Sequence, residues 1–236
     1  MEKYIIKDFK RPVETIIKGF EQSDVSTVYE AQGKLGLMDP YLKPILDDTL
    51  IVGPAVTVYC GPGDNLMIHA AIEVCKPGDI LVVVSEDGAP AGMIGDLVVE
   101  ALMKQGVKGM IMDVGMRDVA SIRKMGFPIW TKAVYSKGTS KSRTGWVNAP
   151  VVCGGEIVRC GDIIMADDDG VVVVRKEDAE KSLAAAKKRA EKEVATREKI
   201  NKGEFSIDFY NLRAVLEKDN VVYYENEEAF QLKSKG

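Results

Sequence analysis

Two aspartates and an arginine are the residues of this chain whose types and spacing best suit catalysis. Asp96 ends the segment Gly92-Met93-Ile94-Gly95-Asp96, and Arg117-Asp118 follows about one β-α unit later. We expect both acids where a strand leads into a helix, the edge at which α/β sheets bind their ligands. Arginine binds carboxylates through two parallel hydrogen bonds, and aspartate can hold a hard divalent cation. This spacing can therefore fold an anion site and a metal site into one pocket.

The glycine-containing segment suits the anion. Gly92 and Gly95 let the backbone approach a ligand closely, and the helix expected after Asp96 adds the positive end of its dipole. Arg117 can bind the same anion, and Asp118 can hold a divalent cation that keeps several waters. Together they predict a site for a 2-oxo acid chelated to Mg²⁺.

Structural explanations exist for each of these residues. Asp96 and Asp118 are both good helix N-caps, and Arg117-Asp118 could be a surface ion pair worth under about 1 kcal/mol. The dinucleotide-binding fingerprint is excluded, because Gly88, Gly92 and Gly95 have the wrong spacing for it. Only the combination of the three residues favours a site.

Three further side chains are candidates for substrate contact. His69 is the only histidine and lies one helical turn after Asn65, so the two can face one side of a helix. A histidine packed in the core is the alternative. Lys141 lies in a polar Ser/Thr/Gly loop, where a solvated charge is the alternative. Gly61-Pro62-Gly63-Asp64 predicts a turn that ends in an N-cap for the Asn65 helix.

Composition narrows the class of protein. The 236 residues are 46% hydrophobic with a net charge of −4, which favours a globular core and argues against nucleic acid or anionic membranes as partners. No apolar run is long enough to span a membrane, and the N-terminus lacks a signal-peptide pattern, so we expect a cytoplasmic protein. Zinc is not expected with one histidine and no Cys-x-x-Cys pair. The four cysteines are expected to be reduced core thiols: Cys60, Cys75, Cys153 and Cys160.

The pattern of apolar residues predicts an α/β protein with a partly parallel sheet. We expect a single core domain over residues 1–175, and a C-terminal helix and tail over 176–236 that packs on a neighbouring subunit. Within the core, a capping box at Thr27 starts a helix, and a strand over 49–60 is broken near Gly53-Pro54. Residues 12–33 are expected to form one or two helices, and the further expected helices span 65–75, 96–105, 118–125, 176–202 and 207–216. The expected strands span 79–85, 108–113, 128–134, several short segments within 151–175, and 221–224.

Several segments resemble the class II pyruvate aldolase family. That family includes 4-hydroxy-4-methyl-2-oxoglutarate / 4-carboxy-4-hydroxy-2-oxoadipate aldolases and the related regulators of ribonuclease E activity. The signature is an aspartate followed, after twenty residues, by Arg-Asp, and Asp96 and Arg117-Asp118 keep that spacing. His69, residues 145–152 and the C-terminal tail are similar to the aldolase branch. The other matching segments are 53–58, 63–66, 92–96, 148–155 and 166–171.

The resemblance implies an α-β-β-α sandwich with a swivelling-domain-like (β/β/α) core, assembled as trimers or hexamers with sites between subunits. It implies retro-aldol cleavage of a 4-hydroxy-2-oxo di- or tricarboxylic acid to pyruvate plus oxaloacetate or a second pyruvate. Oxaloacetate decarboxylation would be a side activity, and aromatic compound degradation the setting. An aldolase for another 2-oxo acid, or a non-catalytic regulator of ribonuclease E type, are the alternatives.

The resemblance also assigns roles. Asp118 would anchor Mg²⁺ or Mn²⁺, and the metal would polarise the substrate carbonyl. Arg117 and the amides of Gly92, Met93, Ile94, Gly95 and Asp96 would bind the pyruvate end. Asp96, with a glutamate from the C-terminal helix of a neighbouring subunit, would position a water as acid and base; Glu193 is the first choice for that glutamate and Glu198 the second.

Asn65, His69 and Lys141 would contact distal carboxylates of the substrate. The chain departs from the family where an acid often follows Asp118 by three residues, because Ser121 stands there. It also has Met93-Ile94 where Gly-Gly is common. Nothing in the sequence resembles a site for S-adenosylmethionine.

Overall fold

The computed structural model describes residues 2–234. The chain divides into two compact units, Met1–Ala190 and Glu191–Gly236. The division falls inside helix α6 (Ala179–Asn201), because the first turns of this helix bury Ala179, Leu183 and Ala186 against the core of the first unit. The two units are described separately below.

A mixed sheet forms the centre of the first unit, with strand order β1-β5-β4-β3-β2-β9-β10 and with β6 paired to β2. Neighbours from β2 to β5 pair in parallel, and the remaining pairs are antiparallel. The strands are β1 (Lys43–Pro44), β2 (Ile51–Cys60), β3 (Ile80–Ser85), β4 (Gly109–Met116), β5 (Ile129–Val134), β6 (Trp146–Val147), β9 (Ile163–Asp167) and β10 (Gly170–Val174). A separate hairpin joins β7 (Val151–Cys153) and β8 (Glu156–Val158).

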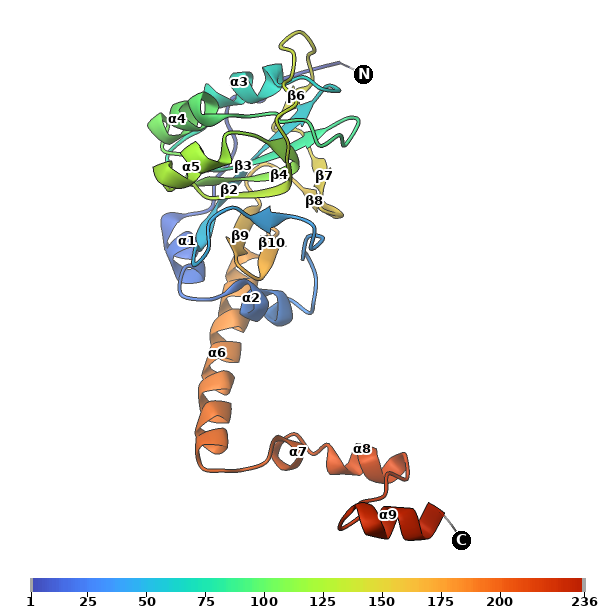
Figure 1. Ribbon diagram of the computed structural model, residues 1–236. Helices are drawn as coiled ribbons and strands as arrows, with labels where there is room; N and C mark the ends of the chain where they lie inside the picture. The colour runs from blue at the N-terminus through green and yellow to red at the C-terminus, as the bar shows by residue number, and fades with distance from the viewer. Residues whose placement is uncertain (1, 235–236) are drawn as a thin grey trace. The chain divides into compact units, whose positions relative to one another are not determined.

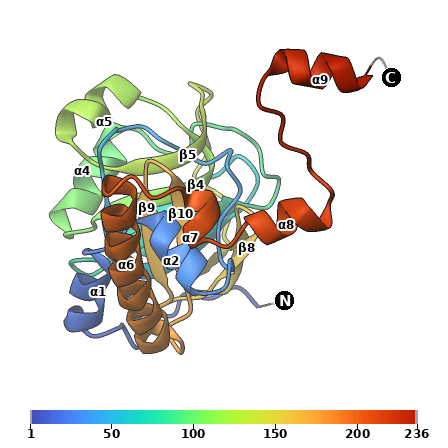
Figure 2. The same ribbon diagram turned by 90° about the horizontal axis from the view of Figure 1, so that it is seen from below.

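Both faces of the sheet carry buried apolar side chains, so each face is covered by another layer. The helices α3 (Leu66–Ile72), α4 (Asp96–Lys104) and α5 (Val119–Met125) cover one face of β2 to β4 (Figure 1). The β7-β8 hairpin and β9 pack over the other face. Around β9 and β10 lie α1 (Glu14–Phe20), α2 (Val25–Ala31) and the start of α6 (Figure 2). The expected α/β sandwich class is confirmed.

Strand β2 differs from the sequence prediction, because it runs unbroken through Gly53-Pro54. Ile51 to Pro54 pairs with β9, whereas the strand from Ala55 onwards pairs with β3. Pro54 therefore lies where the strand exchanges one partner for another, and its missing N–H is tolerated there. The expected break was wrong because a proline at this point ends one ladder without ending the strand.

One helix boundary and one strand boundary also differ. Helix α2 is capped by Asp24, whose Oδ1 accepts a hydrogen bond from Thr27 N at 2.6 Å, so Thr27 is not the cap. Strand β4 continues to Met116, into the segment 114–116 that was expected to be a loop. The short antiparallel strands expected within 151–175 are confirmed.

The second unit contains the end of α6 followed by short helices. The predicted helix over 207–216 is divided into α7 (Ser206–Phe209) and α8 (Arg213–Lys218), because Asn211 between them adopts a positive φ of 56°. Residues 221–224 do not form the predicted strand, and α9 (Glu227–Ser234) follows.

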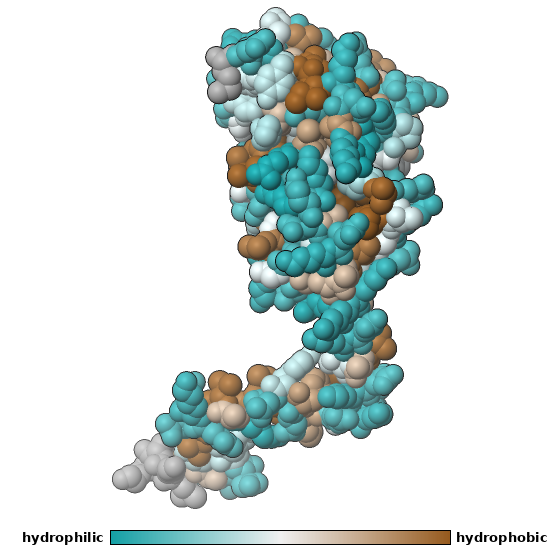
Figure 3. Space-filling view, turned by 180° about the vertical axis from the view of Figure 1, so that it is seen from behind, coloured by the Kyte–Doolittle hydropathy of each residue, from teal (hydrophilic) through white to brown (hydrophobic). Residues whose placement is uncertain are grey.

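Hydrophobic side chains alternate with hydrophilic ones on the second unit, as the surface view shows (Figure 3). Phe205, Tyr210 and Val215 are more than half exposed. Packing of this unit on a neighbouring subunit stays a prediction. Among the residues that the structure describes, no helix combines the length and the apolarity needed to cross a membrane.

Candidate active site

The predicted site residues meet in a cavity of about 310 Å³ in the first unit. Its walls are the 92–95 loop, the start of α4, Arg117-Asp118, one face of α3 and the loop over 138–141. The residues singled out from the sequence that line it are Asn65, His69, Gly92, Met93, Ile94, Gly95, Asp96, Arg117, Asp118 and Lys141. Residues far apart in the chain thus line the same cavity, although their catalytic roles stay predictions.

The 92–95 loop lies beside the end of β4. Met93 N donates to Gly115 O at 2.9 Å, and Arg117 N donates to Ile94 O at 3.0 Å. These two bonds hold the chain that leads into Asp96 next to the chain that leads into Asp118. The parallel sheet therefore brings the two acids to one edge, as expected for strands whose carboxyl ends lie together.

Asp118 is the N-cap of α5, but its side chain makes no capping hydrogen bond. Its backbone adopts the left-handed conformation, with φ 59° and ψ 28°. The carboxylate lies 3.8 Å from Arg117 Nε, and both side chains are nearly half exposed. Capping, the structural alternative for this residue, does not account for its side chain, which remains available to a ligand.

Asp96 is the first residue of α4, and Gly95 is the N-cap. The Oδ1 atom of Asp96 accepts a hydrogen bond from the neighbouring Leu97 N at 2.9 Å. That local bond holds one oxygen of the carboxylate at the helix start, and Asp96 lines the cavity. Asp96 therefore does not act as the N-cap that the sequence suggested as its alternative role.

The expected amide cradle from Gly92 to Asp96 needs a correction. Gly92 N already donates to Lys137 O at 2.8 Å, and Met93 N to Gly115 O, so these two amides serve the backbone. Within residues 2–234, no acceptor is found for the amides of Ile94, Gly95 and Asp96. These three N–H groups, at the positive end of α4, are the ones that could bind an anion.

Helix α3 supplies another wall of the cavity. Asn65 Nδ2 donates to Met93 O at 2.8 Å and ties this helix to the 92–95 loop. Asn65 Oδ1 and His69 Nε2 are buried and have no hydrogen-bond partner among the described residues. Burial, and next the positive charge of Lys141, hold the pKa of His69 below its usual value, so the neutral imidazole is favoured.

The loop that carries Lys141 also brings Gly138 and Thr139 to the cavity, two residues that the sequence analysis missed. The only signal for them was their place in the polar loop around Lys141. Asp64, expected to be a simple cap, is fully buried beneath this loop. Ser121, at the third position of α5, is exposed, and its N–H bonds to Asp118 O at 3.0 Å.

Glu193 and Glu198, the candidates for a glutamate from a neighbouring subunit, belong to the second unit. The residues that line the cavity all belong to the first unit. The structure describes a single chain, so the contribution of either glutamate to a neighbouring cavity stays a prediction.

The donor atoms around the cavity fit one class of metal. Among the described residues, no three His, Cys, Asp or Glu side chains cluster as a complete metal cage. Two carboxylates at an open cavity instead suit Mg²⁺ or Mn²⁺, which bind through few protein oxygens and keep water or substrate oxygens as the remaining ligands. Zinc is disfavoured, because the free cysteines lie outside this cavity.

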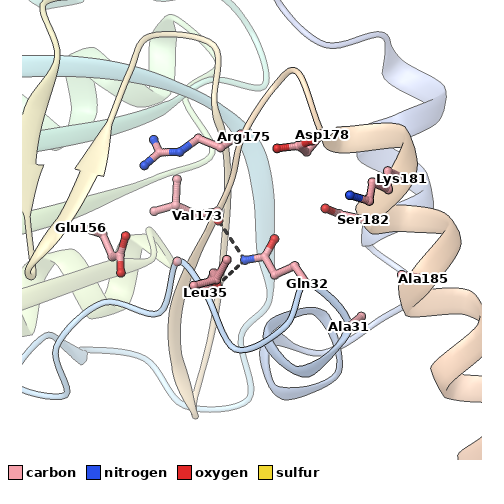
Figure 4. A pocket seen from close by; sticks show the side chains of 11 residues that line it. Ala31, Gln32, Leu35, Glu156, Val173, Arg175, Asp178, Lys181, Ser182 and Ala185 are labelled. Carbon is pink, nitrogen blue, oxygen red and sulfur yellow. Dashed lines mark hydrogen bonds between the residues drawn. The ribbon is translucent and has the colours of Figure 1, made fainter.

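A second, larger cavity of about 520 Å³ lies between α2, β10 and the start of α6 (Figure 4). Two of its polar side chains, Gln32 and Arg175, are committed to the fold. Gln32 Nε2 donates to Leu35 O and to Val173 O, and Arg175 forms an ion pair with the buried Asp162 at 2.8 Å. The smaller cavity combines two carboxylates and an arginine with backbone amides at a helix start that have no acceptor among the described residues, so it is the better candidate for chemistry.

Comparison with known proteins agrees with this geometry. The family model of RraA-like proteins, described as Aldolase/RraA, matches residues 23–173, which include the whole cavity lining. The chain belongs to the RraA-like family. A relative from Halalkalibacterium halodurans is 31% identical over 86% of this chain and 94% of its own length, and carries the name "Putative 4-hydroxy-4-methyl-2-oxoglutarate aldolase".

Solved structures of this RraA-like chain's relatives share its fold. Streptomyces coelicolor RraAS2, described as an unusual member of the RNase ES inhibitor RraA protein family, superposes with a TM-score of 0.73. It is 27% identical, and the match covers 80% of this chain and 99% of that one. An uncharacterised protein from Pseudomonas syringae also gives a TM-score of 0.73 at 21% identity, covering 84% and 97% of the two chains.

Proposed function

We propose that this RraA-like protein is a divalent-metal-dependent aldolase that cleaves a 4-hydroxy-2-oxo di- or tricarboxylic acid. The observation that carries the proposal is the single cavity in which Asp118, Arg117 and the amides at the start of α4 lie together. The relatives that are named 4-hydroxy-4-methyl-2-oxoglutarate aldolases support the substrate class. The products are pyruvate with either oxaloacetate or a second pyruvate.

The pyruvate end of the substrate binds between Arg117 and α4. The Arg117 guanidinium donates to the substrate carboxylate, and the amides of Ile94, Gly95 and Asp96 add neutral donors. Asp118 would hold Mg²⁺ or Mn²⁺, which when bound supplies Lewis-acid polarisation of the 2-oxo group. The distal carboxylates extend towards α3 and Lys141, which is the cation besides Arg117 among the described residues that line the cavity.

The reaction needs only one group that accepts a proton and later returns it. A base, Asp96 or a water that it orients, removes the proton of the C4 hydroxyl, and the C3–C4 bond breaks. The electron pair passes to the pyruvate fragment as its enolate, and the same carrier returns the proton to C3. Decarboxylation of oxaloacetate passes through the same enolate, so it is the expected side activity.

Pyruvate release tests the proposal. It is followed with lactate dehydrogenase and NADH, using 4-carboxy-4-hydroxy-2-oxoadipate, 4-hydroxy-4-methyl-2-oxoglutarate and oxaloacetate in turn. We expect turnover with added Mg²⁺ or Mn²⁺ and its loss in EDTA. If none of the three acids gives metal-dependent pyruvate, the protein is not this aldolase.

A regulator of a ribonuclease is the second candidate, favoured by the match to RraAS2 over nearly its whole length. Such a regulator would bind the ribonuclease through its surface, so residues of the cavity would not be needed for inhibition. Inhibition of a ribonuclease E-type enzyme that survives Asp118→Ala, in a protein without metal-dependent turnover, would favour the regulator.

A further inference from the structure

Asp64 is a buried carboxylate with an unusual set of partners. Its side chain is fully buried, and Oδ2 accepts hydrogen bonds from Ser140 Oγ at 2.6 Å, Ser142 N at 2.6 Å and Arg143 N at 3.0 Å. Oδ1 accepts from Leu66 N, in the first turn of α3, at 2.9 Å. A single side chain thus joins α3 to the loop that carries Lys141.

The partners of Asp64 lie on both sides of Lys141. Ser140 precedes the lysine and Ser142 follows it, and both bond to the same carboxylate oxygen. Two backbone bonds reinforce the attachment, Asn65 N to Ser140 O and Ser140 N to Gly63 O, each at 3.0 Å. The backbone on either side of Lys141 is therefore fixed relative to α3, the helix that carries Asn65 and His69.

The other bonds that hold this loop lie away from Lys141: Tyr135 N to Met116 O, Gly92 N to Lys137 O and Lys3 Nζ to Thr144 O. Residues 134–144 are exposed apart from Thr139, which is half-buried, so the loop has no apolar anchor in the core. A buried carboxylate that accepts several hydrogen bonds is a strong attachment, because each bond is charge-assisted. Burial by itself would raise the pKa of Asp64, but the hydrogen bonds from Ser140, Ser142, Leu66 and Arg143 outweigh it and lower the pKa to about 2. The carboxylate is therefore ionised at neutral pH.

We propose that Asp64 is a positioning residue, which holds the Lys141 loop against α3 so that the ammonium reaches the distal carboxylate of the substrate. This proposal rests on the aldolase function above, since it assigns Lys141 to the end of the substrate remote from Arg117. Asp64 itself does not line the cavity. Its effect is on recognition of the long acid and not on the bond that breaks.

Asp64→Asn tests the attachment with nearly the same shape. An amide cannot satisfy Leu66 N on one side and Ser142 N on the other, because one of its ends is itself a donor. Asp162→Asn is the matched control. Asp162 is equally buried and also accepts backbone bonds, from Arg159 N and Lys176 N, but lies outside the cavity. Ser140→Ala removes only the hydroxyl bonds to Asp64 Oδ2 and Gly63 O, and serves if Asp64→Asn does not fold.

The kinetic readout is the KM for 4-hydroxy-4-methyl-2-oxoglutarate. Loss of the attachment should raise KM by about tenfold, the size of one lost charge-assisted contact, with kcat within about twofold of wild type. Lys141→Met should raise KM as much, and the double variant no further, because both changes remove the same contact. Inhibition by oxalate, which lacks the distal part of the substrate, should be unchanged. Equal losses in kcat and in oxalate affinity, or a normal KM, would overturn the proposal.

Hydrogen exchange tests the attachment without activity. The amides of Ser142 and Arg143 should lose protection in Asp64→Asn and keep it in Asp162→Asn. Retained protection in Asp64→Asn contradicts the attachment whatever the enzyme turns over. Lost protection in a protein without turnover would instead show that the aldolase function is wrong while the attachment exists.

Discussion

The Asp118 carboxylate occupies the space beside Gly95 that a side chain at residue 95 would need. A Cβ atom built on Gly95 would collide with Asp118 Oδ2, and it would approach Arg117 Nε to 3.4 Å. Gly95 is also the N-cap of α4. The glycine therefore places the cap of one helix against the metal-binding candidate at the start of the next.

Gly95→Ala should displace the Asp118 carboxylate. A displacement of about 1 Å at a reacting group can cost on the order of 100-fold in rate, so we expect a loss of that size in kcat/KM and a weaker response to Mg²⁺. Gly138→Ala is the matched control, since a Cβ there meets Arg117 Nη1 only at an ordinary 3.7 Å. The activity of both variants is measured by steady-state pyruvate release. Equal activity of the two variants would show that the contact does not position Asp118.

Arg117→Ala should raise KM and lower kcat, because the guanidinium binds the substrate carboxylate and orients the reacting carbons. The loss of a charge-assisted pair costs roughly 1.5–3 kcal/mol, or about 10- to 100-fold in kcat/KM. Arg117→Lys keeps the charge but loses the two-pronged contact, so it should recover only part of the activity. Full activity in Arg117→Lys would mean that charge alone matters at this position.

His69 should titrate below the usual histidine pKa, and as the only histidine it gives one set of NMR signals. Lys141→Met should raise its pKa, but only in part, because burial is the larger cause. Because the pKa of His69 is lower in the folded chain, the unfolded chain binds more protons at this residue. The contribution of the neutral imidazole to folding stability is therefore present above about pH 6.5 and is lost as pH falls through the folded-state pKa. Chemical denaturation should therefore show a smaller stability loss on acidification in His69→Gln. An unchanged His69 pKa in Lys141→Met would place the lysine away from the imidazole.

The alternation of expected strands and helices along the chain was enough to predict the parallel core and the proximity of Asp96 to Arg117-Asp118. Those features depend on the strand-to-helix order, which fixes the sheet edge at which loops gather. The continuity of β2 through Pro54 could not be read from local propensity, because it depends on β9, more than 100 residues later, taking over the pairing.

The role of Asp64 was missed for a similar reason. Its sequence context is that of a helix cap, and the bond to Leu66 N agrees with a local role. The hydrogen bonds to Ser140 and Ser142 join Asp64 to residues 76 and 78 positions away, and the pattern of apolar residues in the sequence does not predict them. Likewise, the engaged amides of Gly92 and Met93 depend on pairing with Gly115 and Lys137, which only the folded chain shows.

Binding of Mn²⁺ to wild type and to Asp118→Ala, measured by calorimetry in the presence of oxalate, tests the central claim most directly. Exposed Asp47, which lies outside the cavity, provides the matched control Asp47→Ala. We predict saturable binding in wild type and Asp47→Ala, its loss in Asp118→Ala, and loss of metal-dependent pyruvate release in the same variant. Wild-type Mn²⁺ affinity in Asp118→Ala would contradict the assignment of Asp118 as the metal ligand.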